Sequence, residues 1–179
     1  YKIAVSKQSA TKMVGGLQDN GGYAYSNNQW KNYYGADGMD TAISNVNSNL
    51  YYGFIQNGGN LYISTDSGNS LSGSVGSPND VDGNWVTPLI TVDPSNDNIM
   101  YVVNGNAIHK STDKGINFTQ VYTSTGAIVA IEVHSSNSNI VYVVTSGTSG
   151  EVRKSTDGGL TFTNISQGLP SIGKNTIVH

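Results

Sequence analysis

Apolar and polar residues alternate in short runs along the whole chain, and turn-forming residues (Gly, Asn, Asp, Ser and Pro) separate these runs. Residues 1–7 and 12–17 are the first two runs. Alternation with a period of two residues, interrupted by turn signals, is typical of short β-strands joined by tight turns. The pattern therefore predicts an all-β protein.

The first unit of this pattern, residues 1–34, is predicted to hold four strands. A strong turn signal at residues 19–22 follows the two opening strands. Residues 23–26 and 29–34 are then expected to form a hairpin around Asn27 and Asn28, because Asn tolerates the backbone conformations of tight turns.

The later part of the chain repeats one short frame, Ser-x-Asp-x-Gly followed by a polar and an apolar residue. The frame begins at Ser64, Ser111 and Ser155, so the steps are 47 residues (111 − 64) and 44 residues (155 − 111). Steps of roughly 40–50 residues are expected when one four-stranded propeller blade repeats. The positions that define the three copies are Ser64, Asp66 and Gly68; Ser111, Asp113, Gly115 and Phe118; and Ser155, Asp157, Gly159 and Phe162.

The residue types in this frame favour a structural turn. The Asp carboxylate can accept hydrogen bonds from backbone N–H groups a few residues further on. The Gly can adopt a positive φ angle, and the apolar residue after it opens the next strand and can fold back over the hairpin. We therefore assign Asp66, Asp113 and Asp157 to turns and not to catalysis.

The repeat predicts a β-propeller of four-stranded antiparallel blades, with blades at about 1–34, 35–86, 87–123 and 124–166 and the start of a further blade at 167–179. A blade cannot bury both of its faces alone. We therefore expect an arc of a larger ring, completed by remaining blades of the same chain or by a second chain.

Composition removes several classes of function. Charged residues make up 12% of the chain, the formal net charge is −3, and there is no basic cluster, so nucleic-acid binding is not expected. The lack of cysteine excludes disulfides and thiolate metal sites. No apolar run approaches the ~20 residues of a membrane helix. The three histidines, His109, His134 and His179, are too scattered to predict a metal site.

The repeated frame resembles the Asp-box (BNR) repeats of sialidase-type, sortilin-type and xyloglucan-cleaving propellers. Residues 16–21, followed by Trp30, residues 35–38 and the turn at Ser64, also resemble secreted bacterial propellers of the BNR-repeat or sortilin-like, glycosyl-hydrolase type, many from Bacteroidetes. The resemblance covers nearly the whole chain and implies a secreted or cell-surface location. It does not select one function, because such propellers include enzymes and binders.

The chain departs from two enzymes of this group. Sialidases hold the substrate carboxylate with three arginines, whereas this chain has the single Arg153. The xyloglucan-cleaving enzymes use two Asp carboxylates, and neither surrounding motif can be matched here. Sialidase activity is therefore not expected in this segment.

Three acidic residues outside the repeated frame are candidates for chemistry: Asp19, Asp37 and Asp40. We expect Asp19 to follow an innermost strand, and Asp37 and Asp40 to lie in the connection between the first two blades. There they could converge on a pocket with Gln18, Trp30, Tyr33 and Tyr34. Paired carboxylates beside aromatic rings suit carbohydrate binding or hydrolysis.

Two further interpretations remain open. The same oxygen ligands would suit Ca²⁺, the one cofactor considered, although Asp80 and Asp82 lack the distal Glu of a calcium loop and are expected in a solvated loop. Alternatively, Asp19 and Asp37 stabilise Gly-rich turns.

The leading functional prediction for the chain is a module for protein or glycan recognition or for surface assembly, non-catalytic in this segment. The alternative is part of a glycoside hydrolase whose acidic residues lie partly outside it.

Overall fold

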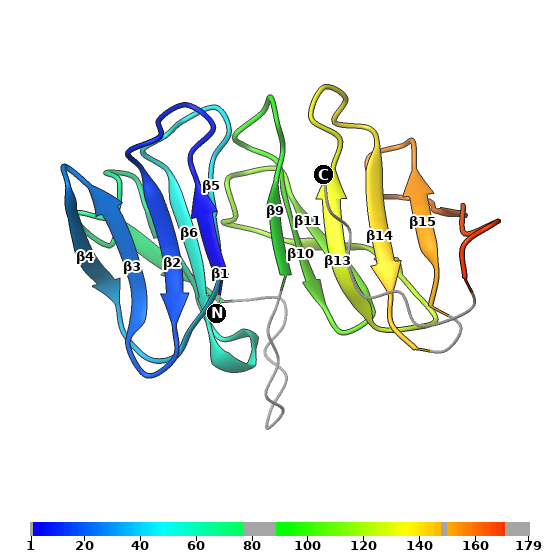
Figure 1. Cartoon of the computed structure of the whole chain (residues 1–179), viewed down its shortest axis with the longest axis horizontal. Coiled ribbons are helices and arrows are strands. Elements are labelled where there is room, and N and C mark those ends of the chain that lie inside the picture. The colour runs from blue at the N-terminus through cyan, green and yellow to red at the C-terminus, as the bar shows by residue number, and fades with distance from the viewer. Residues whose placement is uncertain (1, 77–88, 148–149, 171–179) are drawn as a thin grey trace.

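A computed structural model describes residues 2–76, 89–147 and 150–170, and these residues form four antiparallel sheets of four strands each (Figure 1). We number the sheets as blades 1 to 4 in chain order. Blade 1 contains β1 (Lys2–Val5), β2 (Met13–Leu17), β3 (Gly21–Ser26) and β4 (Gln29–Tyr34); blade 2 contains β5 (Gly38–Ile43), β6 (Tyr51–Ile55), β7 (Leu61–Ser64) and β8 (Gly73–Val75); blade 3 contains β9 (Leu89–Val92), β10 (Met100–Asn104), β11 (Ala107–Ser111) and β12 (Thr119–Thr123); blade 4 contains β13 (Ile128–Val133), β14 (Val141–Thr145), β15 (Val152–Ser155) and β16 (Thr163–Asn164). One 3-10 turn, η1 (Gln56–Gly58), follows β6.

The blades stand side by side along an arc, from β4 at one end to the β13–β16 sheet at the other (Figure 1). The first strands of the blades, β1, β5, β9 and β13, contact one another in sequence and form the inner edge of the arc. Strand order within each blade follows the chain, which is the arrangement of a propeller. The predicted all-β propeller fold, present here as a partial arc, is confirmed.

Side chains of adjacent blades interdigitate and form three hydrophobic clusters. The cluster between blades 1 and 2 holds Val14, Ala24, Tyr33, Tyr34, Ile43 and Tyr51. The cluster between blades 2 and 3 holds Met39, Ala42, Leu50, Tyr52, Phe54, Leu61, Met100 and Val102. The cluster between blades 3 and 4 holds Tyr101, Val103, Ile108, Ile128, Ile131, Val133, Val141 and Val143. Each blade is therefore stabilised by burying its apolar positions against a neighbouring blade.

The predicted hairpin of blade 1 is present, with β3 and β4 paired on either side of Asn27 and Asn28. Both Asn residues have positive φ, 51° and 63°. Two consecutive residues of this kind form the two-residue turn that matches the right-handed twist of a hairpin.

The three Ser-x-Asp-x-Gly segments form almost identical turns, which we call aspartate turns. In the one at Asp113, the Ser111 hydroxyl donates to the carboxylate at 2.8 Å and accepts from the Gly115 N–H at 2.9 Å. The carboxylate also accepts from the Asn117 backbone and side chain, at 2.8 and 2.7 Å. The turns at Asp66 and Asp157 repeat this network. These contacts confirm the structural assignment of the frame.

The aspartate turns also contain a feature that the sequence pattern did not predict. The residue before the glycine has a positive φ as well: Ser67 at 64°, Lys114 at 63° and Gly158 at 72°. Two successive left-handed residues therefore reverse the chain, and a non-glycine residue occupies the first of them in two of the turns. Phe118 and Phe162 fold back onto neighbouring clusters as expected, whereas Leu71 is exposed.

The aspartate turns make the fold sensitive to acid. Hydrogen bonds from the residue four positions later hold the pKa values of Asp66, Asp113 and Asp157 below the usual range. Because the folded pKa values are depressed, this stabilisation is complete above the unfolded value of ~3.9 and is lost as pH falls through the folded values. We expect the urea midpoint to fall steadily below about pH 4, and to fall less steeply in Asp113→Asn than in the control Asp97→Asn. Equal slopes for the two variants would contradict this account.

Some expectations lie outside the described residues. They are the loop with Asp80 and Asp82, His179, and residues 171–179 of the expected further blade. The outer strand of blade 2 is β8, which is short and largely exposed.

Candidate functional site

Asp19 and Asp37 meet at one exposed corner of the arc, where blades 1 and 2 adjoin. Asp19 lies in the turn between β2 and β3 with a φ of 61°, and its backbone N–H donates to Oδ1 of Asp37 at 2.6 Å. Sheet order corrects one expectation: β2 is the second strand of its blade, so Asp19 does not follow an innermost strand. The turn that holds Asp19 therefore lies against the Asp37 side chain, and the convergence of the two carboxylates on one pocket stays a prediction.

A close backbone approach between the blades creates this corner. A Cβ atom on Gly38 would lie 2.0 Å from the Gly21 carbonyl oxygen and 2.7 Å from the Leu17 nitrogen. A Cβ atom on Gly16 would lie 1.9 Å from the Met39 carbonyl oxygen. Since only glycine fits such spacing, the glycines around Asp19 and Asp37 allow the two turns to touch.

The two carboxylates differ in how they are held. The Asp37 backbone N–H donates to Oε1 of Gln56 at 3.0 Å, so η1 also supports this corner. Asp19 is exposed, and no hydrogen bond within the described part of the chain engages its carboxylate. Gln18 is exposed beside it, and its carbonyl accepts from Asn20 Nδ2 at 2.9 Å. The corner therefore presents one unengaged acceptor on a rigid turn.

Asp40 has different surroundings from those expected. It lies within β5 and not in the connection between blades, and its side chain is buried. It accepts from Lys2 Nζ at 3.1 Å, the Thr41 N–H at 2.9 Å and the Ile90 N–H at 3.2 Å. Burial raises the pKa of this carboxyl, and the Lys2 ammonium opposes that shift. These bonds tie β1, β5 and β9 together, so the arrangement indicates a structural role.

Asp40 and Lys2 also line a cavity of about 340 Å³ at the inner edge of the arc. Glu132 of β13 lines it as well, together with apolar residues of β9 and β13. The Asp40 oxygens are already engaged, so this cavity offers a ligand few free acceptors.

Tyr33 and Tyr34, expected as ligand contacts, belong to the core between blades 1 and 2. The Tyr34 ring stacks on Tyr62 at 4.7 Å, and its hydroxyl donates to the Phe54 carbonyl at 3.3 Å. Burial raises the pKa of both tyrosines. Their burial corrects the expectation that they form an exposed aromatic platform.

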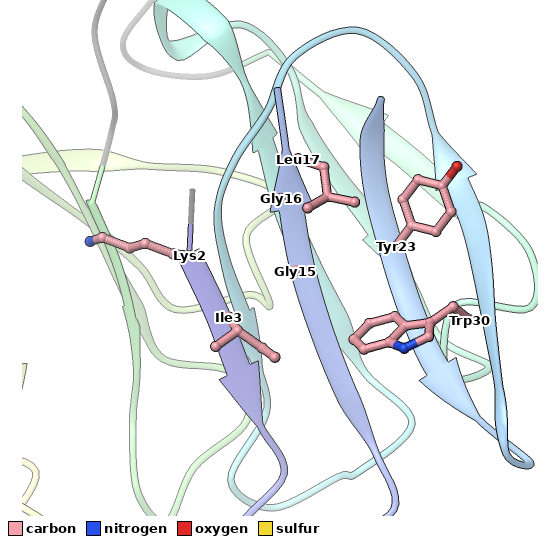
Figure 2. Close-up of a pocket in the computed structure, with 7 residues that line it drawn as sticks. All are labelled: Lys2, Ile3, Gly15, Gly16, Leu17, Tyr23 and Trp30. Carbon is pink, nitrogen blue, oxygen red and sulfur yellow. The ribbon is translucent and has the colours of Figure 1, made fainter. Parts of the chain in front are cut away.

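Trp30 lines a hollow of about 480 Å³ on the outer face of blade 1 with Ile3, Leu17 and Tyr23 (Figure 2). The figure shows the indole ring lying back over the sheet toward Ile3. In blades 2 to 4, the second-strand positions on the corresponding face pack against the preceding blade, as Tyr51, Met100 and Val141 do. The hollow therefore has the character of a blade-packing face.

Within residues 2–76, 89–147 and 150–170, no group of three or more His, Cys, Asp or Glu side chains is placed to hold a metal ion. The considered Ca²⁺ site thus gains no support from these residues. No helix in the same residues has the length and apolar character of a membrane span.

Solved propellers resemble the arc. An ancestral GH74 enzyme superposes with a TM-score of 0.71 at 19% identity over 93% of this chain, and the GH74 xyloglucanase from Xanthomonas campestris with 0.66 at 20% identity over 91%. YCF48 bound to D1 peptide superposes with 0.53 at 13% identity over 71% of this chain and 39% of its own. The chain spans 24% of either GH74 structure, about a quarter of its length.

No protein-family model and no curated protein sequence matches the chain. At these identities the structural likeness establishes the fold alone: this chain is a segment of a β-propeller.

Proposed function

We propose that the chain is part of a secreted or cell-surface propeller of the Asp-box type that recognises a glycan at the corner formed by Asp19 and Asp37. The segment itself is non-catalytic in this proposal. The contact that supports it most directly is the 2.6 Å hydrogen bond from the Asp19 N–H to Asp37 Oδ1, which holds the Asp37 carboxylate against the Asp19 turn at the surface.

The chemistry of the corner favours sugar hydroxyls. A carboxylate accepts hydrogen bonds without donating, and a hydroxyl bonded to an ionised group makes a stronger contact than a neutral pair does. The likeness to GH74 enzymes, one of them titled a xyloglucanase, points to glycans as the first ligands to test.

Binding of xyloglucan oligosaccharides by isothermal titration, preceded by a glycan array, tests this proposal. A charge-assisted hydrogen bond contributes about 1.5–3 kcal/mol, so we expect Asp19→Asn to raise Kd by roughly tenfold or more. Asp97→Asn is the matched control, because Asp97 pairs with Lys114 on the surface of blade 3. Equal affinity of wild type and Asp19→Asn would overturn the proposal, and silence on the glycan array would favour a role in protein binding or assembly.

Part of a glycoside hydrolase, with acidic residues partly outside this segment, is the second candidate, and the adjacent positions of Asp19 and Asp37 support it. Hydrolysis of a glycosidic bond uses two carboxyl groups, one as acid and one as base or nucleophile. In this case Asp19→Asn and Asp37→Asn would each abolish the release of reducing ends from xyloglucan. Binding without release of product would favour the recognition module.

A further inference from the structure

The aspartate turns do more than reverse the chain, because each one packs on the blade before it. A Cβ atom on Gly68 would lie 2.1 Å from Cβ of Ala24 in blade 1. A Cβ atom on Gly115 would lie 3.5 Å from the Tyr52 ring in blade 2, and a Cβ atom on Gly159 would lie 3.2 Å from the Tyr101 ring in blade 3. Three successive junctions therefore use the same contact between a turn and the second or third strand of its neighbour.

The junction between blades 3 and 4 shows the polar part of this contact. The Tyr101 hydroxyl and Lys110 Nζ both donate to the Gly158 carbonyl oxygen, at 3.0 and 3.1 Å. Lys110 Nζ lies 5.2 Å from the centroid of the Tyr101 ring. Two donors on adjacent strands thus converge on one carbonyl of the aspartate turn, and Tyr101 is completely buried at this junction.

Blade 4 carries the same pair of residues at the same register. Tyr142 lies opposite Lys154 just as Tyr101 lies opposite Lys110. Lys154 Nζ lies 5.9 Å from the centroid of the Tyr142 ring, and both side chains are partly exposed. Among the described residues, neither the Tyr142 hydroxyl nor the Lys154 ammonium has a hydrogen-bond partner.

We propose that Tyr142 and Lys154 form a docking site for the aspartate turn of a further propeller blade. The carbonyl of the residue after the Asp in that turn accepts from both side chains, and the glycine that follows packs on the Tyr142 ring. The partner is defined by its chemistry: a blade with a Ser-x-Asp-x-Gly turn whose second left-handed residue lacks a Cβ atom.

A second copy of this chain does not fit this description. Its three aspartate turns are already packed on Ala24, Tyr52 and Tyr101 of the same chain. Blade 1, which a head-to-tail copy would place on blade 4, has the two-residue Asn27-Asn28 turn in place of the frame. The occupant is therefore a blade beyond the four described.

An extended chain tests the proposal. A copy of residues 135–166 is appended after His179, because Val178-His179 matches Val133-His134 in sequence. The copy then supplies the second to fourth strands and the aspartate turn of a next blade. Amide hydrogen exchange and thermal unfolding report whether the added blade docks. We expect the amides of the added strands to be protected from hydrogen exchange. We also expect Lys154→Gln to lower the thermal unfolding midpoint by roughly 2–4 °C in the extended chain and to leave it unchanged in the original chain.

Replacing the lysine equivalent to Lys154 by Gln in the appended copy is the matched control, since no further blade covers that copy. Tyr142→Phe, which retains the ring and removes one donor, provides a second variant with the same expected pattern. The proposal is overturned if the added strands exchange freely, or if Lys154→Gln shifts the midpoint equally in both chains or at both positions.

Discussion

Gly38→Ala is expected to destabilise the chain by about 3 kcal/mol or more, at the upper end of what overpacking costs. The new Cβ atom would lie 2.0 Å from the Gly21 carbonyl oxygen, 2.5 Å from its carbon and 2.7 Å from the Leu17 nitrogen. All three atoms belong to the backbone, so no side chain can rotate away to relieve the clash. Blade 2 must move relative to blade 1.

That movement should also increase the separation between Asp19 and Asp37 in the candidate site. Asp37 directly precedes Gly38, and its carboxylate accepts from the Asp19 N–H across the same gap. We therefore expect Gly38→Ala to weaken glycan binding as well as stability, whereas Asp19→Asn weakens binding alone.

Gly35→Ala is the matched control for this prediction. It lies in the same connection between blades, and a Cβ atom there meets nothing within 4 Å. Urea denaturation followed by circular dichroism should show a lower midpoint for Gly38→Ala only. A change of less than about 1 kcal/mol in Gly38→Ala would show that the two blades can move apart freely, contrary to the close approach described here.

Features that depend on neighbouring residues alone could be predicted from the sequence. The aspartate turns need only Ser, Asp and Gly at fixed spacing, and their hydrogen bonds join residues two to four positions apart. The Asn27-Asn28 hairpin is local in the same way. Because the turns recur at blade spacing, the propeller fold followed from them.

Features that depend on how blades approach one another could not be predicted in this way. The contact of Asp19 with Asp37 requires the glycines of two blades to touch, which no local pattern encodes. Asp40 is expected in the connection between the first two blades, yet in the structure Gly38 begins β5 and Asp40 lies within that strand. There glycine serves close packing and does not break the strand.

The burial of both Tyr33 and Tyr34 could not be predicted for a different reason, an irregularity in strand pairing. Strand alternation would place one of two adjacent residues in the core and the other in solvent. A register shift between Gly22 and Tyr23, opposite these tyrosines, interrupts that alternation at the end of β4. A bulge of this kind cannot be read from the sequence of one strand, because it depends on the partner strand.

Tyr34→Ala should consequently be among the most damaging substitutions in the chain, with a loss of about 3–5 kcal/mol of unfolding free energy. Tyr34 is 4% exposed, stacks on Tyr62 at 4.7 Å and meets Tyr33 edge-on at 4.8 Å. Removing the ring leaves a cavity between two blades that neighbouring backbone cannot fill. Trp30→Ala is the matched aromatic control, because Trp30 is 49% exposed and should lose only about 1 kcal/mol.

Tyr34→Phe separates a core role from a ligand role. It retains the stacked ring and removes only the 3.3 Å hydrogen bond to the Phe54 carbonyl, so we expect a loss of about 1 kcal/mol in stability. Glycan affinity, measured by titration on the folded variant, should equal that of the wild type, because the hydroxyl faces the core and not the corner at Asp19. If Tyr34→Phe instead lowered affinity with unchanged stability, Tyr34 would be a ligand contact and the site would extend between the blades.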